Sequence, residues 1–276
     1  MPVHTLEAEV ERVDLGRRVF DDPGSGVNQS ACHTLYLVMT SEGGVKHIVD
    51  RVGQALALGM AVPALHFLTQ IAAAPFYPGY SFLSRDASTL GSHGSSAPWV
   101  FNVGSLVVGI VTVLAAWGFL RALQEARANR VMTWLTSLAL VSTGLAGVNA
   151  FLFPLPDARH TQSILALFGS ATFLLPALMP AVLWKLPEAR RAKAYFVINI
   201  VVCLALIPIM SGLIQRLAMM AGGEIPGYQS FLNGYHGVLQ RVAAVVVFVP
   251  IGVGAWILLS QRTGGHAASA FATDAG

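Results

Sequence analysis

Six long runs of apolar residues alternate with short polar segments along the chain. The runs cover residues 52–74, 99–120, 131–153, 162–184, 194–217 and 237–260. A helix needs about 20 apolar residues to cross roughly 30 Å of hydrocarbon, so each run is long enough for a transmembrane helix. The runs lack the alternating pattern of barrel strands, and backbone polar groups in lipid must be hydrogen-bonded internally. The pattern therefore predicts an all-α fold, a polytopic membrane bundle of six transmembrane helices.

The segments that flank these runs are polar or rich in small residues. Residues 1–50 contain no apolar run of signal-peptide length, so we expect a polar cytoplasmic segment rather than a leader. Met1 and Met39 are both compatible with the start of translation. The transmembrane domain is expected over residues 51–261, followed by a Gly-, Ala- and Ser-rich tail, 262–276, that is expected to be disordered.

The composition agrees with a location in the membrane. The 276 residues are 54% hydrophobic and 11% charged, whereas a soluble domain carries about 25% charged residues. So few charges cannot cover a soluble surface, which excludes soluble enzyme classes. The two cysteines, Cys32 and Cys203, are too few for a disulfide framework or a cysteine zinc site. The basic residues lie in short loops rather than in a stripe, so we expect membrane lipids and no nucleic acid as partners.

Lysine and arginine residues are distributed unevenly between alternate loops. With the N-terminus in the cytoplasm, thirteen of the seventeen lie on the cytoplasmic side and three on the other, while Arg241 lies within the sixth run. Cytoplasmic loops carry an excess of these residues. We therefore predict a multi-pass protein of the cytoplasmic (inner) membrane with both termini in the cytoplasm.

Small residues and prolines within the runs predict how the helices pack. Ser105 with Gly109, and Ser142 with Ala146 and Ala150, are spaced at about one helical turn and favour close helix approach. Five prolines remove backbone donors and are expected to bend the helices that contain them. They are Pro63, Pro176, Pro180, Pro208 and Pro250.

Arg241 is the most informative charge, because none of the six runs contains an Asp or Glu. The missing carboxylates lower the expectation of an ion-coupled pump. A guanidinium within a run needs a partner, for which the candidates are Asp86 or Asp157 folding inward, or a lipid phosphate. Arg216, at the outer end of the fifth run, raises the same question. The alternative for both arginines is that they extend to the membrane interface and have no further role.

Polar side chains gather at the predicted outer face, where loops 75–98 and 218–236 are the longest connections. The second of these loops is expected to form an ordered cap over the bundle. The candidate ligand-binding residues are Asp86, Ser88, Asn102, His160, Arg216, Gln240 and Arg241.

Histidines and one carboxylate are the candidate catalytic groups. His160, His236 and Asp86 suit acid/base chemistry, because imidazole and carboxylate exchange protons and also bind zinc. No HExxH-type spacing supports a metal site, and no metal is predicted. His66 lies in the middle of the first run without a second deep histidine, so neither haem nor another cofactor is predicted.

Several short motifs occur in a fixed order between residues 52 and 260. They are Ser88-x-Leu90-Gly91, Asn102-x-Gly104, Phe153-Pro154 followed by His160, and Gly237 followed by Gln240-Arg241. In this order the chain resembles a bacterial and archaeal family of six-span membrane proteins, domain of unknown function 998. Gln240 stands where that family frequently has an acid. The family is similar to a wider eukaryotic group that includes DRAM and a factor for remodelling GPI lipids, which implies a connection to lipid handling.

Three functions follow from these observations, in order of preference. The first is binding or handling of an anionic lipid headgroup at the outer leaflet. The second is a membrane-embedded hydrolase or transferase that acts on lipid through a metal or acid/base groups. The third is a small-solute transporter, which ranks last because polar side chains are sparse in the cytoplasmic half of the runs. The sequence predicts no particular ligand or oligomeric state and leaves enzymatic activity open.

Overall fold

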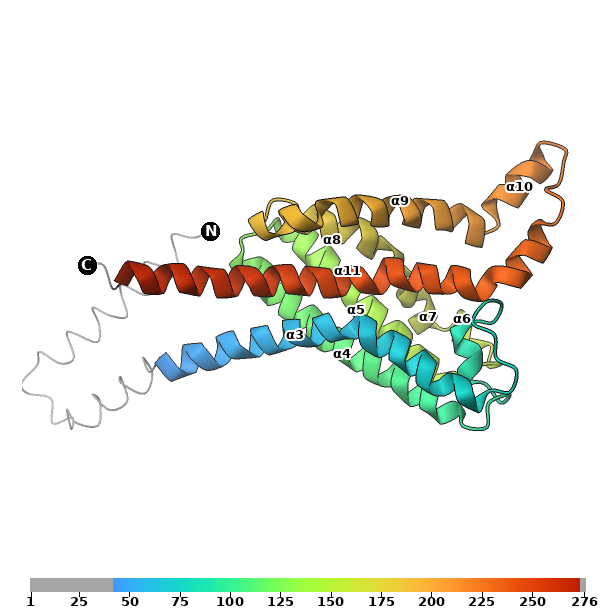
Figure 1. Cartoon of the computed structure of the whole chain (residues 1–276), viewed down its shortest axis with the longest axis horizontal. Coiled ribbons are helices and arrows are strands. Elements are labelled where there is room, and N and C mark those ends of the chain that lie inside the picture. The colour runs from blue at the N-terminus through green and yellow to red at the C-terminus, as the bar shows by residue number, and fades with distance from the viewer. Residues whose placement is uncertain (1–41, 274–276) are drawn as a thin grey trace, which may run out of the picture. The chain divides into compact units, whose positions relative to one another are not determined.

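The computed structural model describes residues 42–273, and side chains within residues 51–263 (Figure 1). The polar segment expected at 1–50 therefore lies almost wholly outside the described residues. Residues 51–276 form a compact unit of their own. Six helices are long and apolar enough to cross a membrane, and no strand occurs between residues 42 and 273, which confirms the predicted all-α, six-span architecture.

The helices follow one another with short connections. The α-helices are α3 (Glu42–Ala73), α4 (Pro98–Glu125), α5 (Arg130–Leu152), α6 (Arg159–Gln162), α7 (Ile164–Gly169), α8 (Leu175–Leu183), α9 (Lys193–Met210), α10 (Leu213–Met220) and α11 (Tyr228–Thr273). The 3₁₀ helices are η1 (Ala74–Phe76), η2 (Ala87–Gly91), η3 (Ser170–Leu174) and η4 (Pro187–Ala192). We call the end with residues 77–97 the loop end, and the end with residues 126–129 and 184–192 the basic end.

The fourth span is broken rather than continuous. Between Ile164 and Leu183 the chain passes through α7, η3 and α8 in succession. Pro176 has no N–H to donate to the carbonyl four residues earlier, that of Thr172, so the preceding turn tightens into the 3₁₀ helix η3. Instead of a simple bend at this proline, the span therefore contains a short 3₁₀ helix before α8 begins.

The fifth span lies earlier in the chain than the predicted 194–217, over Pro187–Met210. Helix α9 ends at Met210, two residues after Pro208, and Gly212 adopts a left-handed conformation with φ 69°. Residues 213–220 form the separate helix α10, which turns away from α9 in Figure 1. Most of residues 221–236 are exposed, so this connection does not form the expected cap over the bundle.

The sixth helix is much longer than the predicted 237–260. Helix α11 begins at Tyr228 and continues to Thr273, so it extends beyond the predicted run at both ends. The segment beyond Gly265 is rich in alanine, the residue with the highest helix propensity, and this favours continuation of the helix.

Close helix crossings form where the sequence carries small residues. A Cβ atom on Gly109 would lie 2.6 Å from the carbonyl oxygen of Gly144, and one on Gly147 would lie 2.6 Å from that of Ser105. Helices α4 and α5 therefore approach backbone to backbone, as the spacing of Ser105 and Gly109 predicts. The Ser142 hydroxyl donates to the carbonyl of Phe168, which joins α5 to α7.

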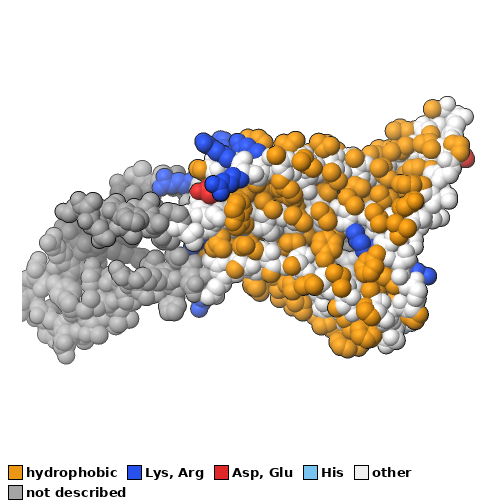
Figure 2. Space-filling view, in the orientation of Figure 1, with side chains coloured by type: hydrophobic (Ala, Val, Ile, Leu, Met, Phe, Trp, Pro, Cys, Tyr) orange, Lys and Arg blue, Asp and Glu red, His pale blue; other side chains and the backbone are white. Residues whose placement is uncertain are grey.

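Large apolar side chains fill the bundle toward the basic end. Fully buried members of this core include Leu56, Phe119, Leu123, Leu140, Met179, Leu183, Ile251 and Leu258. Arg262 of α11 pairs with Glu125 of α4 at the same end. Figure 2 shows hydrophobic side chains over the middle of the molecule and basic ones gathered at this end. Such a surface suits a bundle surrounded by hydrocarbon.

Candidate ligand site at the loop end

A cavity of about 390 Å³ lies between the helices in the half of the bundle nearest the loop end. All six spans contribute to its wall. Its polar lining residues are His66, Thr69, Gln70, Ser88, Ser105, Thr143, His160, Thr172, Gln240 and Arg241. Apolar residues such as Phe101 and Phe248 complete the wall. A mainly apolar cavity with a few convergent polar groups is the usual form of a small-molecule site.

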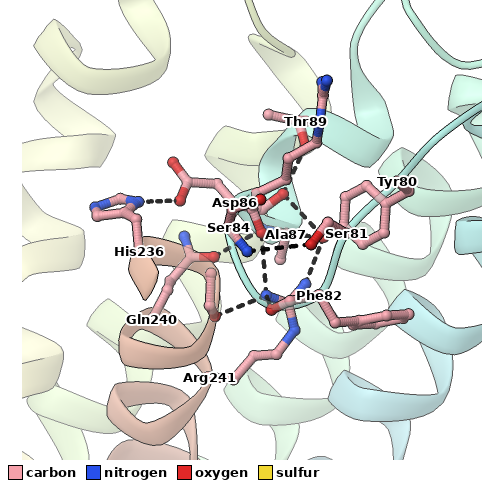
Figure 3. Close-up of polar contacts among 12 residues, drawn as sticks. Tyr80, Ser81, Phe82, Ser84, Asp86, Ala87, Thr89, His236, Gln240 and Arg241 are labelled. Atoms are coloured by element: carbon pink, nitrogen blue, oxygen red, sulfur yellow. Dashed lines mark hydrogen bonds and ion pairs between the residues drawn. The ribbon is translucent and has the colours of Figure 1, made fainter. Parts of the chain in front are cut away.

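Residues 77–97, which we call the capping segment, are fixed to α11 by a close backbone approach (Figure 3). The N–H of Val238 donates to the carbonyl of Leu83 at 3.0 Å. A Cβ atom on Gly237 would lie 2.6 Å from the carbonyl oxygen of Arg85 and 2.7 Å from that of Phe82. Only glycine at 237 therefore allows the capping segment to lie against the helix.

Arg241 is held mainly by backbone carbonyl groups. Its Nη1 donates to the carbonyl oxygens of Phe82 at 3.0 Å, Arg85 at 3.1 Å and Gly237 at 2.7 Å. Its Nη2 donates to the Tyr80 hydroxyl, and the Phe82 ring centroid lies 4.7 Å from Cζ. The buried Nε has no partner among the described residues. The expected carboxylate partners are thus replaced by neutral oxygens, which the sequence does not reveal.

Asp86 pairs with His236 instead of with the guanidinium. This ion pair joins the capping segment to the first turns of α11 (Figure 3). Beside it, the Ala87 N–H donates to Gln240 Oε1 at 2.7 Å, and Tyr80 donates to the Asp86 carbonyl at 3.0 Å. Burial raises the pKa of the Tyr80 phenol, so the phenol stays a neutral donor at ordinary pH.

His160 occupies the opposite wall of the cavity in a fixed orientation. Its Nδ1 lies 2.7 Å from the carbonyl oxygen of Phe153, which only accepts hydrogen bonds, so Nδ1 carries the proton. The Asn149 amide donates to the His160 carbonyl at 2.8 Å and accepts from Ser163. In the neutral imidazole, Nε2 is left with a free lone pair.

His66 and Gln70 form a polar pair on α3 that is absent from the ligand-binding residues expected from the sequence. Gln70 is only 2% exposed, its Nε2 lies 2.9 Å from His66 Nε2, and its Oε1 has no partner among the described residues. The His66 ring stacks on Phe248 with the centroids 4.0 Å apart. The signal in the sequence is a pair of polar residues four positions apart in an apolar run, which places both on one helix face.

The candidate ligand-binding residues are only partly brought together. Ser88, His160, Gln240 and Arg241 line the cavity. Asn102 instead donates to the Gly91 carbonyl at 3.1 Å, where it fixes the capping segment to α4. Arg216 is exposed on α10, outside the cavity wall.

The three candidate catalytic residues do not form one cluster. Asp86 and His236 pair where the capping segment meets α11, whereas His160 is held by the Phe153 carbonyl at the cavity wall. The described part of the chain contains no group of three His, Cys, Asp or Glu residues placed to hold a metal ion.

Comparison with known proteins identifies the family. Residues 60–257 match the model of the family described as "Protein of unknown function (DUF998)". No curated protein and no solved structure matches the chain. The similarity to the wider eukaryotic group stays a prediction. Because the match covers most of the chain and six apolar helices fit a multi-span architecture, this membrane protein belongs to the DUF998 family.

Proposed function

We propose that this protein binds a membrane lipid with an anionic headgroup in the loop-end cavity. The observation that carries the proposal is the guanidinium of Arg241 in a cavity wall that contains no Asp or Glu among the described residues. The carbonyl oxygens around Arg241 accept hydrogen bonds from its Nη1 but do not cancel its charge. A charge in such surroundings is costly unless an opposite charge approaches it.

The remaining lining suits a phosphate ester with hydroxyl groups. Arg241 Nε is a buried donor and Gln70 Oε1 a buried acceptor, and neither has a partner among the described residues. Hydroxyl groups of Ser88 and Ser105 lie in the same wall. Hydrogen bonds between ionised groups and a ligand contribute about 1.5–3 kcal/mol each, more than those between neutral groups.

The preference for an anionic headgroup is tested by lipid binding to the purified protein. Native mass spectrometry compares the occupancy of dioleoyl phosphatidylglycerol with that of dioleoyl phosphatidylcholine. We expect a preference of at least tenfold for the anionic lipid, which corresponds to about 1.4 kcal/mol. The substitution Arg241→Gln is expected to remove the preference, and Arg241→Lys to keep part of it. The ratio is measured within each variant, so a change in stability does not affect it. Equal ratios in the wild type and Arg241→Gln would overturn the proposal.

The proposed location is the inner membrane, with both termini in the cytoplasm and the cavity toward the outer leaflet. The excess of basic residues at the opposite end of the bundle supports this orientation. Cysteines at two exposed positions test it, His93→Cys at the loop end and Arg191→Cys at the basic end. An impermeant maleimide should label the first in intact cells and the second only after permeabilisation. The reverse pattern would contradict the orientation.

A second candidate function, hydrolysis or group transfer on the bound lipid, is favoured by the orientation of His160. The hydrogen bond from its Nδ1 leaves Nε2 available as a general base in the cavity wall. Radiolabelled phosphatidylglycerol incubated with the wild type and with His160→Gln tests this function. Turnover by the wild type that is lost in the variant supports it, and no turnover by either protein rejects it for this lipid.

Transport of a small solute fits the structure less well. The half of the bundle toward the basic end is filled by the apolar core around Phe119 and Leu140. The Ser137 hydroxyl buried there donates to the Thr133 carbonyl of its own helix at 2.9 Å, and those of Thr133 and Thr136 have no partner among the described residues. These contacts offer no continuous polar path from the cavity to the basic end.

A further inference from the structure

A second, apolar cavity of about 360 Å³ lies beside the polar one, between η3, α9 and α11. We call it the apolar groove. Its wall includes Phe173 of η3, Cys203 and Leu206 of α9, and Val246 of α11. The single hydroxyl group in its lining is that of Ser211. Such a lining offers a headgroup a single hydroxyl group as a hydrogen-bond partner, but it suits a hydrocarbon chain.

The groove and the polar cavity share part of their walls. Phe173, Met210 and Ala243 line both. On the other side the groove reaches the surface of the bundle, where Ile207 is 46% exposed and Phe173 is 49% exposed. These exposed apolar side chains belong to spans that are surrounded by lipid. The groove therefore lies between the surrounding hydrocarbon and the wall that it shares with the polar cavity.

The capping segment covers part of the polar cavity at the loop end. Its residues Ala87 and Ser88 form part of the cavity wall. Hydrogen bonds and the Asp86–His236 pair hold this segment against α11. The segment therefore covers part of the cavity toward the aqueous end, whereas the groove lies on the lipid-facing side of the bundle.

We propose that the apolar groove holds an acyl chain of the same lipid whose headgroup occupies the polar cavity, and that this lipid enters sideways between η3 and α9. This inference rests on the proposed function. In this arrangement the acyl chain stays in apolar surroundings throughout, so its transfer from the bilayer costs little. The headgroup moves from the membrane interface to polar partners without crossing the apolar core.

Blocking the groove tests the proposal without changing the polar cavity. Cys203→Phe places a ring in the groove, and Leu204→Phe places the same ring on the lipid-facing side of α9, where Leu204 is 63% exposed. Native mass spectrometry measures the occupancy of dioleoyl phosphatidylglycerol. We expect Cys203→Phe to lower the occupancy at least tenfold and Leu204→Phe to leave it within twofold of the wild type. Equal occupancy in the two variants would overturn the inference.

The same spectra distinguish three possibilities: an acyl chain in the groove, a lipid bound through its headgroup only, and a second copy of this chain in the groove. Loss of the preference for the anionic lipid in Arg241→Gln reports on the headgroup site alone, so the proposed function can hold while the groove proposal fails. If the groove instead receives a second copy of this chain, Cys203→Phe should convert a dimer to a monomer with unchanged lipid occupancy. That result would also overturn the inference.

A measurement on the wild-type protein covers the case in which Cys203→Phe does not fold. Phosphatidylglycerol with a diazirine near the end of one acyl chain is crosslinked by light, and the labelled peptides are mapped by mass spectrometry. We expect labels at Cys203, Leu206 and Val246 that disappear with an excess of unlabelled lipid. Labels spread equally over exposed positions such as Leu204, with no effect of the competitor, would contradict the inference.

Discussion

The two halves of the bundle are built from the same helices but are packed differently. In α4, Phe119 and Leu123 lie in the core toward the basic end, whereas Ser105 lines the cavity toward the loop end. In α11, Ile251 and Leu258 fill the core, and Ala243 lines the cavity. The comparison teaches that the cavity arises from small and polar side chains at particular turns, without a different arrangement of helices.

The largest expected effect comes from truncating the packed half. Phe119→Ala removes a fully buried ring and should lower the free energy of unfolding by about 3–5 kcal/mol. Phe248→Ala should cost clearly less, because Phe248 already borders a cavity and its loss only enlarges that space. Thermal unfolding in detergent measures both. Equal losses in the two variants would mean that the halves are packed alike.

The second effect concerns the docking of the capping segment. Gly237→Ala places a Cβ atom against the carbonyl groups of Phe82 and Arg85, which should cost about 1–3 kcal/mol and loosen the segment. Trypsin cleavage after Arg85 measures this loosening and should become several-fold faster. The control is Gly234→Ala, one helical turn earlier on α11, where a Cβ atom meets no atom within 4 Å. Faster cleavage in the control as well would show that any helix-favouring change loosens the segment.

A third comparison uses two buried polar atoms without partners among the described residues, one in each half. Gln70→Leu and Thr136→Val each remove such an atom. Thr136→Val should leave stability unchanged or raise it by about 1 kcal/mol, whereas Gln70→Leu also removes the hydrogen bond to His66 and should lower stability by about 1–3 kcal/mol. Only Gln70→Leu should lower phosphatidylglycerol occupancy, by about tenfold, because Gln70 lines the cavity and Thr136 does not. If neither variant changes lipid occupancy, Gln70 has no part in binding.

The smallest expected effect is on trypsin cleavage of the capping segment, and it should differ between substitutions of two acidic loop residues, Asp86 and Asp157. Asp86→Asn removes the ion pair with His236 and should speed trypsin cleavage after Arg85 by a factor that corresponds to about 0.2–1 kcal/mol. Asp157→Asn should leave cleavage unchanged, because Asp157 pairs with Arg159 within its own loop.

The Asp157–Arg159 pair should also depend on pH. Hydrogen bonds from Arg159 lower the pKa of Asp157, so any contribution of that pair to stability is present above the ordinary carboxyl pKa and is lost as the pH falls through the lowered value.

The apolar pattern was sufficient to predict the six spans, because length and hydropathy alone decide whether a helix crosses a membrane. It could not predict the end of α9 at Met210, since Ile, Leu and Met continue beyond Pro208 and the turn depends on the backbone of Gly212. The length of α11 was missed for a related reason: small residues indicate a flexible tail, but alanine also favours helix.

The candidate site was predicted in part. The sequence places Arg241 within the sixth run and shows no Asp or Glu in any run. These two facts were sufficient to single out its guanidinium as a charge that needs partners from outside the spans. Its partners were missed because any residue has a carbonyl group, so such contacts leave no trace in the sequence. Gly237 belongs to one of the sequence motifs, but the sequence does not explain why a glycine is needed there. The structure explains it, because the capping segment lies too close to α11 for a Cβ atom at this position.

The way in which Arg241 is anchored has a consequence for related chains. Three of its contacts are main-chain oxygens, so these hydrogen bonds do not depend on which side chains occupy positions 82 and 85. Substitutions there can reshape the capping segment while these hydrogen bonds to the cation remain. A cation held in this way allows the same helical bundle to bind different ligands when only the side chains of the capping segment change.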